Sequence, residues 1–188
     1  MPKVTAIIAT YNWSTVLPYS IGSVLKQSFE DFELLVVGDG CTDDSEQVDN
    51  AIEDERVHWH NLAENYGQSA GPHNEGLRLA KGEIIAYLGH DDLWLPHHLE
   101  TMVAAMEAGH DFAYSFLASV REEGKNPVPV PFNPPYFPGK WLPPTAVAHR
   151  LSVIKDVGDW PDFRKLEGVD AESDLWRRIH DGGYKITH

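Results

Sequence analysis

The chain has 188 residues, of which 42% are hydrophobic and 23% are charged. This balance is typical of a globular protein and excludes a wholly disordered chain, and the length predicts a single domain over 1–188. The formal net charge is −14, from 29 acidic and 15 basic residues. A nucleic acid would meet repulsion, so we predict no nucleic-acid partner. Any anionic ligand then needs a local device, such as a metal ion or a helix N-terminus.

No targeting or membrane-spanning segment is expected. The N-terminus lacks the basic and long apolar regions of a signal peptide. The longest uninterrupted apolar run, Ile84 to Leu88, is far shorter than the ~20 residues needed to cross a bilayer. Cys41 is the only cysteine, which excludes an internal disulfide and suits a reducing compartment. We therefore expect a cytoplasmic protein that can associate with a membrane surface only peripherally.

Short apolar runs alternate with amphipathic stretches along the first 120 residues. The runs predict buried strands, and apolar residues spaced three and four apart predict helices. In chain order we expect strands at 4–9, 34–37, 57–60, 84–88 and 112–120, with helices at 17–25, 43–52, 71–80 and 96–108. The second helix is expected to begin at a capping box over 43–46. This alternation predicts an α/β fold with a mixed, mainly parallel sheet flanked by helices.

The composition changes between Pro127 and Pro144, which include eight of the thirteen prolines. Proline interrupts helices and central strands, so 127–144 is predicted to be a long loop. Its Tyr136 and Trp141 either present rings to a ligand or fill local core, and both readings remain open. After the loop we expect a strand at 146–150, helices at 151–157 and 171–181, and a strand at 184–187.

Polar clusters follow three predicted strands. They are Thr10-Tyr11-Asn12, Gly38-Asp39-Gly40 and His90-Asp91-Asp92. Ligands of open parallel sheets bind outside the carboxyl ends of the strands, so we expect these clusters to converge.

Several of these residues have a structural as well as a functional interpretation. Asp91 and Asp92 suit a hard divalent cation, but they also suit the N-terminus of the helix near Pro96. Asn12 favours capping of the helix that follows it. The segment 65–76 is polar and turn-rich, and it either presents backbone donors to a phosphate or is an ordinary helix-entry loop.

Five segments in this order resemble an inverting glycosyltransferase of family 2 with the Rossmann-like GT-A fold. They are 8–12, 36–45, 65–76, 87–96 and 172–178, and 150–158 is similar to the segment that usually precedes the last. The resemblance implies a hexosyltransferase that moves a sugar from a nucleotide-diphosphate donor, with a UDP-sugar favoured, to an acceptor hydroxyl with inversion. It implies a divalent metal, Mn²⁺ or Mg²⁺, and a saccharide, lipid-linked or protein acceptor. Residues 1–120 would bind the nucleotide sugar and 121–188 would form the acceptor side.

The resemblance also implies roles for individual residues. Thr10, Tyr11 and Asn12 would line the nucleoside pocket, with Tyr11 against the base. Asp39 would recognise the base, and Asn74 would lie near the phosphates and sugar. Asp91 and Asp92 would lie in the metal and donor-sugar region, where Asp91 would be the metal ligand and His90 or Asp92 could contribute. Glu172 would be the base for the acceptor hydroxyl, with Asp170 and Asp174 as alternatives.

The sequence departs from the family pattern at three places. Gly38 and Gly89 stand where acids are usual, and Pro72-His73 replaces a small residue plus arginine. The glycines favour an alternative function, a degenerate domain that binds a nucleotide sugar or a protein without turnover, whereas Asp39, Asp91 and Glu172 favour the enzyme. A nucleotidyltransferase would need glycine and a basic residue early in the chain, and 10–15 has neither. The family often continues beyond the point at which this chain ends, so a minimal enzyme and a shortened one both remain open.

Overall fold

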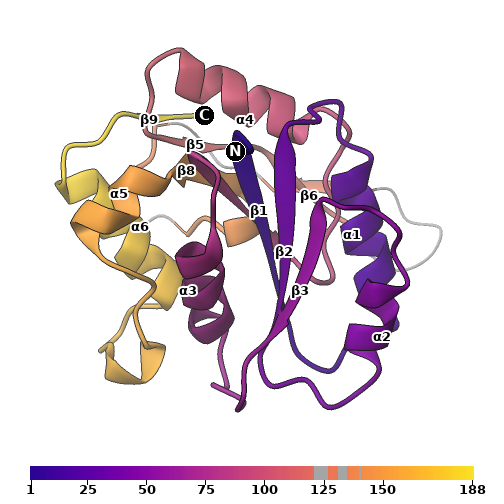
Figure 1. Ribbon diagram of the computed structural model, residues 1–188. Coiled ribbons are helices and arrows are strands. Elements are labelled where there is room, and N and C mark those ends of the chain that lie inside the picture. Colours follow the sequence, from indigo (N-terminus) through magenta and orange to yellow (C-terminus); the bar gives the residue numbers. More distant parts are fainter. Residues whose placement is uncertain (121–126, 131–134, 140) are drawn as a thin grey trace.

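The computed structural model describes residues 1–120, 127–130, 135–139 and 141–188, and its centre is a seven-stranded sheet (Figure 1). The order across the sheet is β3-β2-β1-β4-β8-β5-β9. The paired strands are parallel except that β8 runs antiparallel to both of its neighbours. The strands are β1 (Val4–Thr10), β2 (Phe32–Gly38), β3 (Val57–Asn61), β4 (Ile84–Gly89), β5 (Phe112–Tyr114), β8 (Val147–Arg150) and β9 (Ile186–Thr187). The predicted α/β class with a mixed, mainly parallel sheet is confirmed.

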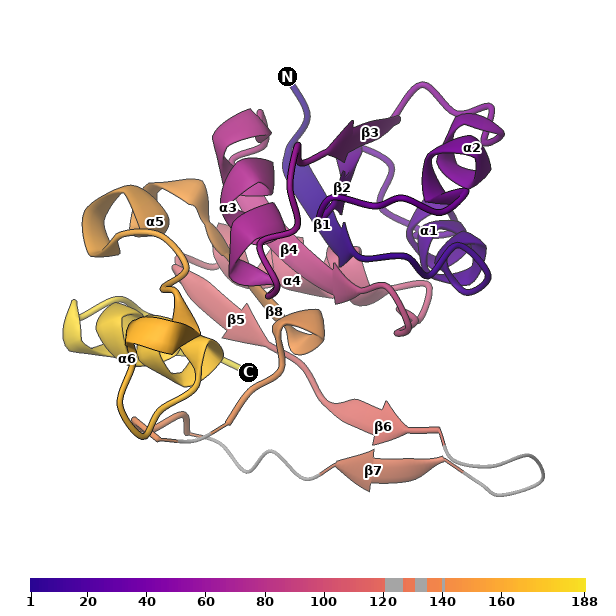
Figure 2. The same cartoon turned by 90° about the horizontal axis from the view of Figure 1, so that it is seen from below.

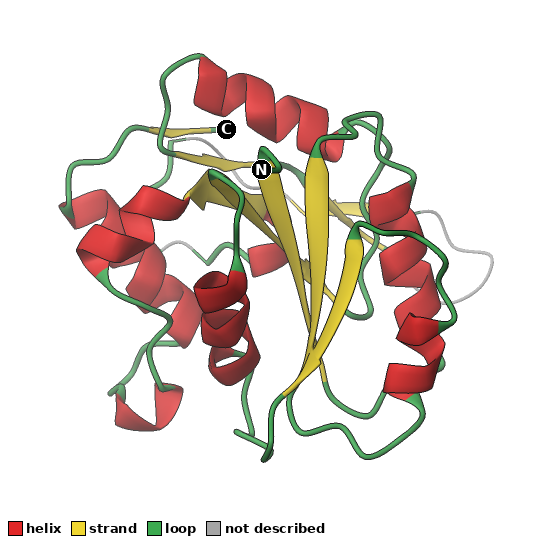
Figure 3. Ribbon diagram, in the orientation of Figure 1, coloured by secondary structure: helices red, strands yellow, loops and turns green. Residues whose placement is uncertain are grey.

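Helices cover both faces of this sheet (Figure 1, Figure 3). Side chains of β1 alternate between two cores, with Ile7 in one and Ala6 and Ile8 in the other. Because both faces are buried, the central strands are continuous apolar runs in the sequence. The core that contains Ile8 is covered by α1 (Leu17–Leu25) and α4 (His98–Glu107). The core that contains Ile7 is covered by α3 (Ala70–Leu79), α5 (Leu151–Val157) and α6 (Ala171–Asp181). The remaining helix, α2 (Ser45–Asn50), packs beside α1.

Residues 112–120 form two strands rather than the single strand that the sequence predicts. After β5 the chain leaves the main sheet, and β6 (Leu117–Ser119) pairs antiparallel with β7 (Val128–Val130). This two-stranded ribbon projects from the body of the molecule (Figure 2). The expectation that all of 127–144 is a loop is therefore wrong at 128–130, because Pro129 lies opposite Ala118 within the ribbon. Both strands are edges, where proline is tolerated. Residues 131–134 and 140 of the expected loop lie outside the described residues.

The capping box expected at the start of α2 does not form. Asp44 occupies the N-cap position but makes no side-chain capping hydrogen bond. The carboxylate of Asp43 accepts instead from the backbone N–H of Ser45 and of Ser14, both at 3.1 Å. It therefore joins the start of α2 to the loop after β1, a contact that the local pattern does not contain.

None of the helices in the described ranges combines the length and the apolar character that a bilayer crossing requires.

Asp49 on α2 is a buried acid that opposes folding at neutral pH. It is 4% exposed, and burial raises its pKa to about 6. Because the folded-state pKa lies above the ordinary 3.8, ionisation destabilises the fold as the pH rises. We expect Asp49→Asn to raise the free energy of unfolding by about 3 kcal/mol at pH 8 and by about 1 kcal/mol at pH 4.5.

Urea unfolding followed by circular dichroism at both pH values measures this difference. The matched control is Asp44→Asn, which removes an exposed acid from the start of the same helix and leaves stability unchanged. An equal gain for Asp49→Asn at the two pH values would show that buried charge is not the cause.

Candidate active site

A cavity of about 500 Å³ lies at the carboxyl ends of β1, β2 and β4. The sheet runs from β1 through β2 to β3 and returns through β4 on the other side of β1, so this is the switch point at which open α/β sheets bind ligands. The structure brings all three predicted polar clusters to this place. The first cluster contributes Thr10 and Tyr11, the second contributes Asp39, and the third contributes His90 to Asp92. The other walls come from 65–73, from the turn Pro144–Ala146 and from α6.

Asn12 ties two loops together and is not among the residues that line the cavity. Its backbone has φ +46°, and its Oδ1 accepts from the backbone N–H of Thr42 at 2.7 Å and of Asp43 at 3.2 Å. The expectation that Asn12 caps the following helix is wrong, because α1 begins at Leu17 without a side-chain cap. Tyr11 does line the cavity and is 48% exposed, so its ring is available to a ligand.

Asp39 both lines the cavity and shapes its wall. Its carboxylate accepts from the backbone N–H of Tyr66 at 2.8 Å and of Gly67 at 3.0 Å, and from Asn65 Nδ2 at 3.2 Å. A carboxylate offers about four acceptor positions. Three are therefore used to hold the loop before α3, and one remains for a ligand.

The missing acid at Gly38 is explained by its neighbours. A Cβ at this position would lie 2.5 Å from Asn61 Oδ1 and 3.1 Å from Cys41 Sγ. Asn61 Oδ1 accepts from the Cys41 N–H at 2.8 Å, and Asn61 Nδ2 donates to the Cys41 carbonyl at 3.0 Å. The amide of Asn61 thus fills the space of an acidic side chain and holds the loop after β2. Sequence analysis missed Asn61 because only the pairing of β2 with β3 brings it here.

Asp91 and Asp92 converge over Gly89 at the end of β4. A Cβ at Gly89 would lie 2.7 Å from Asp92 Oδ2 and 3.3 Å from Asp91 Oδ1, so both carboxylates occupy the space beside the glycine. Partial burial raises the pKa of Asp92, and the negative charge of Asp91 raises it further. Two converging carboxylates are the hard oxygen donors that Mg²⁺ and Mn²⁺ prefer, so these residues fit a divalent cation. No group of three His, Cys, Asp or Glu side chains in the described ranges is placed to hold a metal.

His90 is neutral and engaged with its neighbours. Its Nδ1 lies 3.1 Å from Thr10 Oγ1, and its ring meets the ring of Trp13 edge-on with centroids 4.7 Å apart. Burial lowers the pKa of His90. The imidazole therefore bridges the ends of β1 and β4 without adding positive charge to the cavity.

The three acids proposed at α6 have distinct environments. Asp170 is the N-cap, and its Oδ1 accepts from the Ser173 N–H at 2.7 Å. Asp174 is buried and forms ion pairs with Arg177 at 2.6 Å and Arg178 at 2.9 Å. Glu172 alone of the three lines the cavity. Burial raises its pKa, and the charge of Asp170 adds to the effect.

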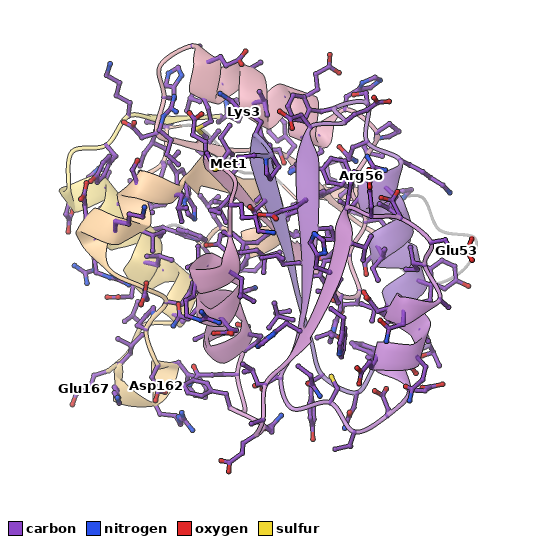
Figure 4. All side chains as sticks on the ribbon, viewed as in Figure 1. Met1, Lys3, Glu53, Arg56, Asp162 and Glu167 are labelled. Atoms are coloured by element: carbon purple, nitrogen blue, oxygen red, sulfur yellow. The ribbon has the colours of Figure 1, made fainter. Side chains whose placement is uncertain are left out.

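Asn74 lies outside the cavity lining. Its Nδ2 donates to the Trp160 carbonyl at 3.0 Å, and its Oδ1 accepts from the Trp160 N–H at 2.9 Å. Gln68 makes a similar link, since its Nε2 donates to Asp162 Oδ1 at 2.6 Å (Figure 4 labels Asp162). The two amides attach the 158–165 loop to α3 and to the loop before it, and Asn74 makes a contact different from the one expected near the phosphates.

The lining residues that sequence analysis left without a role include His73 and Thr145. His73 stood out only as a departure from a family motif, and Thr145 carries no local signal at all. Tyr136 and Trp141 of the proline-rich segment are not among the described lining residues: Tyr136 is buried in the core and Trp141 is 53% exposed. Trp94 and Trp176 are core residues.

The fold and the cavity together define an α/β protein with a ligand site at its switch point and a paired carboxylate at the end of β4. A family model described as glycosyl transferase family 2 matches residues 5–151, and the chain belongs to this family.

Curated relatives match part of the chain. A β-1,3-glucosyltransferase of Escherichia coli, WfaP, whose name gives UDP-Glc and α-D-GlcNAc-diphosphoundecaprenol, is 33% identical over 108 residues, which are 57% of this chain and 42% of the relative. A GalNAc(5)-diNAcBac-PP-undecaprenol β-1,3-glucosyltransferase of Campylobacter jejuni is 34% identical over 113 residues, which are 58% of this chain and 36% of the relative. The chain thus spans less than half of the length of either relative.

Solved structures share the fold over 99% of the chain. S. aureus TarS 1–349 in complex with UDP has a TM-score of 0.78 and 21% identity, and 57% of its chain is covered. The mannosyltransferase PcManGT from Pyrobaculum calidifontis, in complex with GDP-Man and Mn²⁺, has a TM-score of 0.74 and 19% identity, with 54% of its chain covered. The predicted GT-A-like fold is confirmed.

Proposed function

We propose that this chain transfers a hexose from a nucleotide-diphospho-sugar to an acceptor hydroxyl, with inversion and with the assistance of a divalent metal. The observation that carries the proposal is the composition of the cavity wall. Asp39, Asp91, Asp92 and Glu172 line it, and the described lining residues include no lysine or arginine. An anionic diphosphate can bind among these carboxylates only together with a cation.

Four of the lining residues then have a defined role in donor binding. Asp91 and Asp92 hold Mn²⁺ or Mg²⁺, which neutralises the charge of the departing diphosphate when bound. The exposed ring of Tyr11 offers a stacking surface for the base, and Asp39 retains one acceptor position for it. A UDP-sugar is the favoured donor, because the name of one relative gives UDP-Glc together with an α-D-GlcNAc-linked acceptor. A UDP complex is also known for one structural neighbour.

Glu172 accepts the proton of the acceptor hydroxyl. It is half-buried in the wall, and its raised pKa makes it a stronger base than an ordinary glutamate. Inversion requires that the hydroxyl attacks the sugar from the face opposite to the diphosphate. Glu172 stands on α6, whereas the acid pair follows the end of β4, so the base and the metal ligands come from different parts of the wall.

The acceptor side of the proposal comes from the relatives. Both β-1,3-glucosyltransferases are named for saccharides linked to undecaprenol through a diphosphate. We therefore favour a lipid-linked saccharide over a protein as the acceptor, with 121–188 on the acceptor side and 1–120 on the donor side. A cytoplasmic location with peripheral membrane contact belongs to the same proposal.

Isothermal titration with UDP, GDP and dTDP, each with and without Mn²⁺, tests the donor site. We expect UDP to bind in the presence of Mn²⁺ and at least about 10-fold more weakly without it, because the carboxylates repel an unneutralised diphosphate. Asp91→Asn should reduce Mn²⁺-dependent binding by a similar factor, and Asp44→Asn, which removes an acid outside the cavity, should not.

The alternative function is a degenerate domain that has lost turnover, which the glycine at position 89 favours. Metal-dependent UDP binding without transfer to any lipid-linked or free saccharide would support this alternative. Absence of binding for all three nucleotides would contradict the donor site itself.

A further inference from the structure

Two polar side chains in the cavity wall can take a further hydrogen bond. His73 is 5% exposed and Thr145 is 7% exposed, and both line the cavity. Among the described residues, nothing hydrogen-bonds His73 Nδ1, whereas the Thr145 hydroxyl interacts with the Asp92 carboxylate. Buried polar groups in native proteins are nearly always paired, so the unpartnered nitrogen of His73 requires an explanation. A ligand that carries hydroxyl groups would provide it.

The imidazole of His73 is available to such a ligand. Its ring packs against Tyr87 and Trp160, with centroid distances of 4.9 and 4.7 Å. Burial lowers its pKa to about 3, so it is uncharged at neutral pH. Of the side-chain amides in the wall, Asn65 and Gln68 already donate to Asp39 and Asp162.

A neutral imidazole has one donor and one acceptor nitrogen. It therefore matches a sugar hydroxyl, which also donates and accepts. A phosphate offers only acceptor oxygens and negative charge, for which a cation is the better partner. The chemistry of His73 thus favours the sugar part of the donor over its diphosphate.

Thr145 lies at the end of the cavity where the diphosphate is proposed to bind. Its hydroxyl lies beside the Asp92 carboxylate and lowers the pKa of that acid. The Thr145 carbonyl accepts from Trp94 Nε1 at 2.9 Å, which fixes the backbone. Pro143 and Pro144 line the cavity next to it and present the apolar surface that the C–H groups of a sugar require.

We propose that His73 and Thr145 form the subsite that hydrogen-bonds the transferred sugar and selects among sugars, which rests on the proposed donor site. The two side chains come from α3 and from the Pro144–Ala146 turn, so together they contact the sugar from two elements.

Titrations with UDP, UDP-glucose and UDP-GlcNAc in the presence of Mn²⁺ test this subsite. His73→Phe keeps an aromatic ring without nitrogen, and Thr145→Val keeps the shape of threonine without the hydroxyl. We expect each variant to bind UDP within about 2-fold of the wild type and the preferred sugar nucleotide about 10-fold more weakly. His73→Gln, which restores a donor and an acceptor, should recover part of the loss. Thr101→Val, on α4 outside the cavity, is the matched control.

The outcomes separate this proposal from the one on which it rests. Unchanged binding of the sugar nucleotides by both variants, or an equal loss for UDP and for the sugar nucleotides, overturns the subsite and leaves the donor site intact. If the wild type binds UDP but neither sugar nucleotide, the subsite is again overturned and the donor site remains. Failure of the wild type to bind UDP as well overturns both.

Discussion

Replacing Glu172 by glutamine should reduce sugar transfer by about 10²- to 10⁴-fold, the usual contribution of a general base, while UDP binding stays unchanged. Glutamine has nearly the same shape as glutamate but cannot accept the proton of the acceptor hydroxyl. Transfer is measured with the sugar nucleotide that binds the wild type and a lipid-linked saccharide acceptor. Equal turnover of Glu172→Gln and the wild type would exclude Glu172 as the base.

The pH profile of transfer provides a second measurement of the same role. A base must be ionised, and burial raises the pKa of Glu172, so activity should fall as the pH drops through this raised value. Asp170 adds to the shift, and asparagine also serves as an N-cap. Asp170→Asn should therefore retain the helix and move the acid limb of the profile to lower pH. A limb that moves to higher pH, or not at all, would contradict the assignment.

Acidification from pH 7.5 to 4.5 should lower the free energy of unfolding by roughly 6 kcal/mol, a large part of the 5–15 kcal/mol typical of a native protein. Burial lowers the pKa of His73 to about 3 and of His98 and His149 to about 4. Each folded-state value lies below the ordinary 6.5, so stability is lost as the pH falls below 6.5. Each histidine contributes about 2.6 kcal/mol at pH 4.5, and Asp49 offsets about 2 kcal/mol of the sum.

His149 allows the origin of this loss to be tested. Its Nδ1 lies 2.9 Å from the Arg150 carbonyl, so Nδ1 donates and Nε2 accepts from the Tyr87 hydroxyl at 2.9 Å. Trp160 Nε1 donates to the same hydroxyl at 3.1 Å. Protonation of Nε2 would remove the acceptor from a fully buried network.

Urea unfolding at pH 7.5 and 4.5 should show a smaller pH effect for His149→Gln, because an amide does not titrate. The matched control is His97→Gln, whose side chain is 76% exposed and which should retain the wild-type dependence. The same pH effect in His149→Gln and the wild type would show that this histidine is not a cause of acid lability.

The central part of the fold is readable from the sequence because its strands are buried on both faces. Such strands are continuous apolar runs, and β1, β2 and β4 each lie within a few residues of the expected bounds. The rule that ligands bind at carboxyl ends then located the cavity from three polar clusters. The ribbon of β6 and β7 was missed, because a proline inside a short edge strand gives no apolar run and only its partner defines it.

The candidate site was readable only in part, because a residue's position in the chain does not set the direction of its side chain. Local pattern pointed to Asp91 and Asp92 and the family resemblance pointed to Glu172, and all three line the cavity. Asn12 and Asn74 carry the same amide chemistry that a ligand would need, yet each is used to hold another loop.

The sequence by itself determined the α/β class, the central strands and the strand ends at which polar residues gather, because these follow from local periodicity and from residue type. The tertiary structure alone decided which of the three acids at the start of α6 lines the cavity: Asp170 caps the helix and Asp174 pairs with two arginines, which leaves Glu172 in the wall. It also decided that Asn61 replaces an acid beside Gly38 and that Thr145 lies beside Asp92. Each of these contacts joins residues from separate elements, and strand pairing and helix packing, not local pattern, bring such elements together.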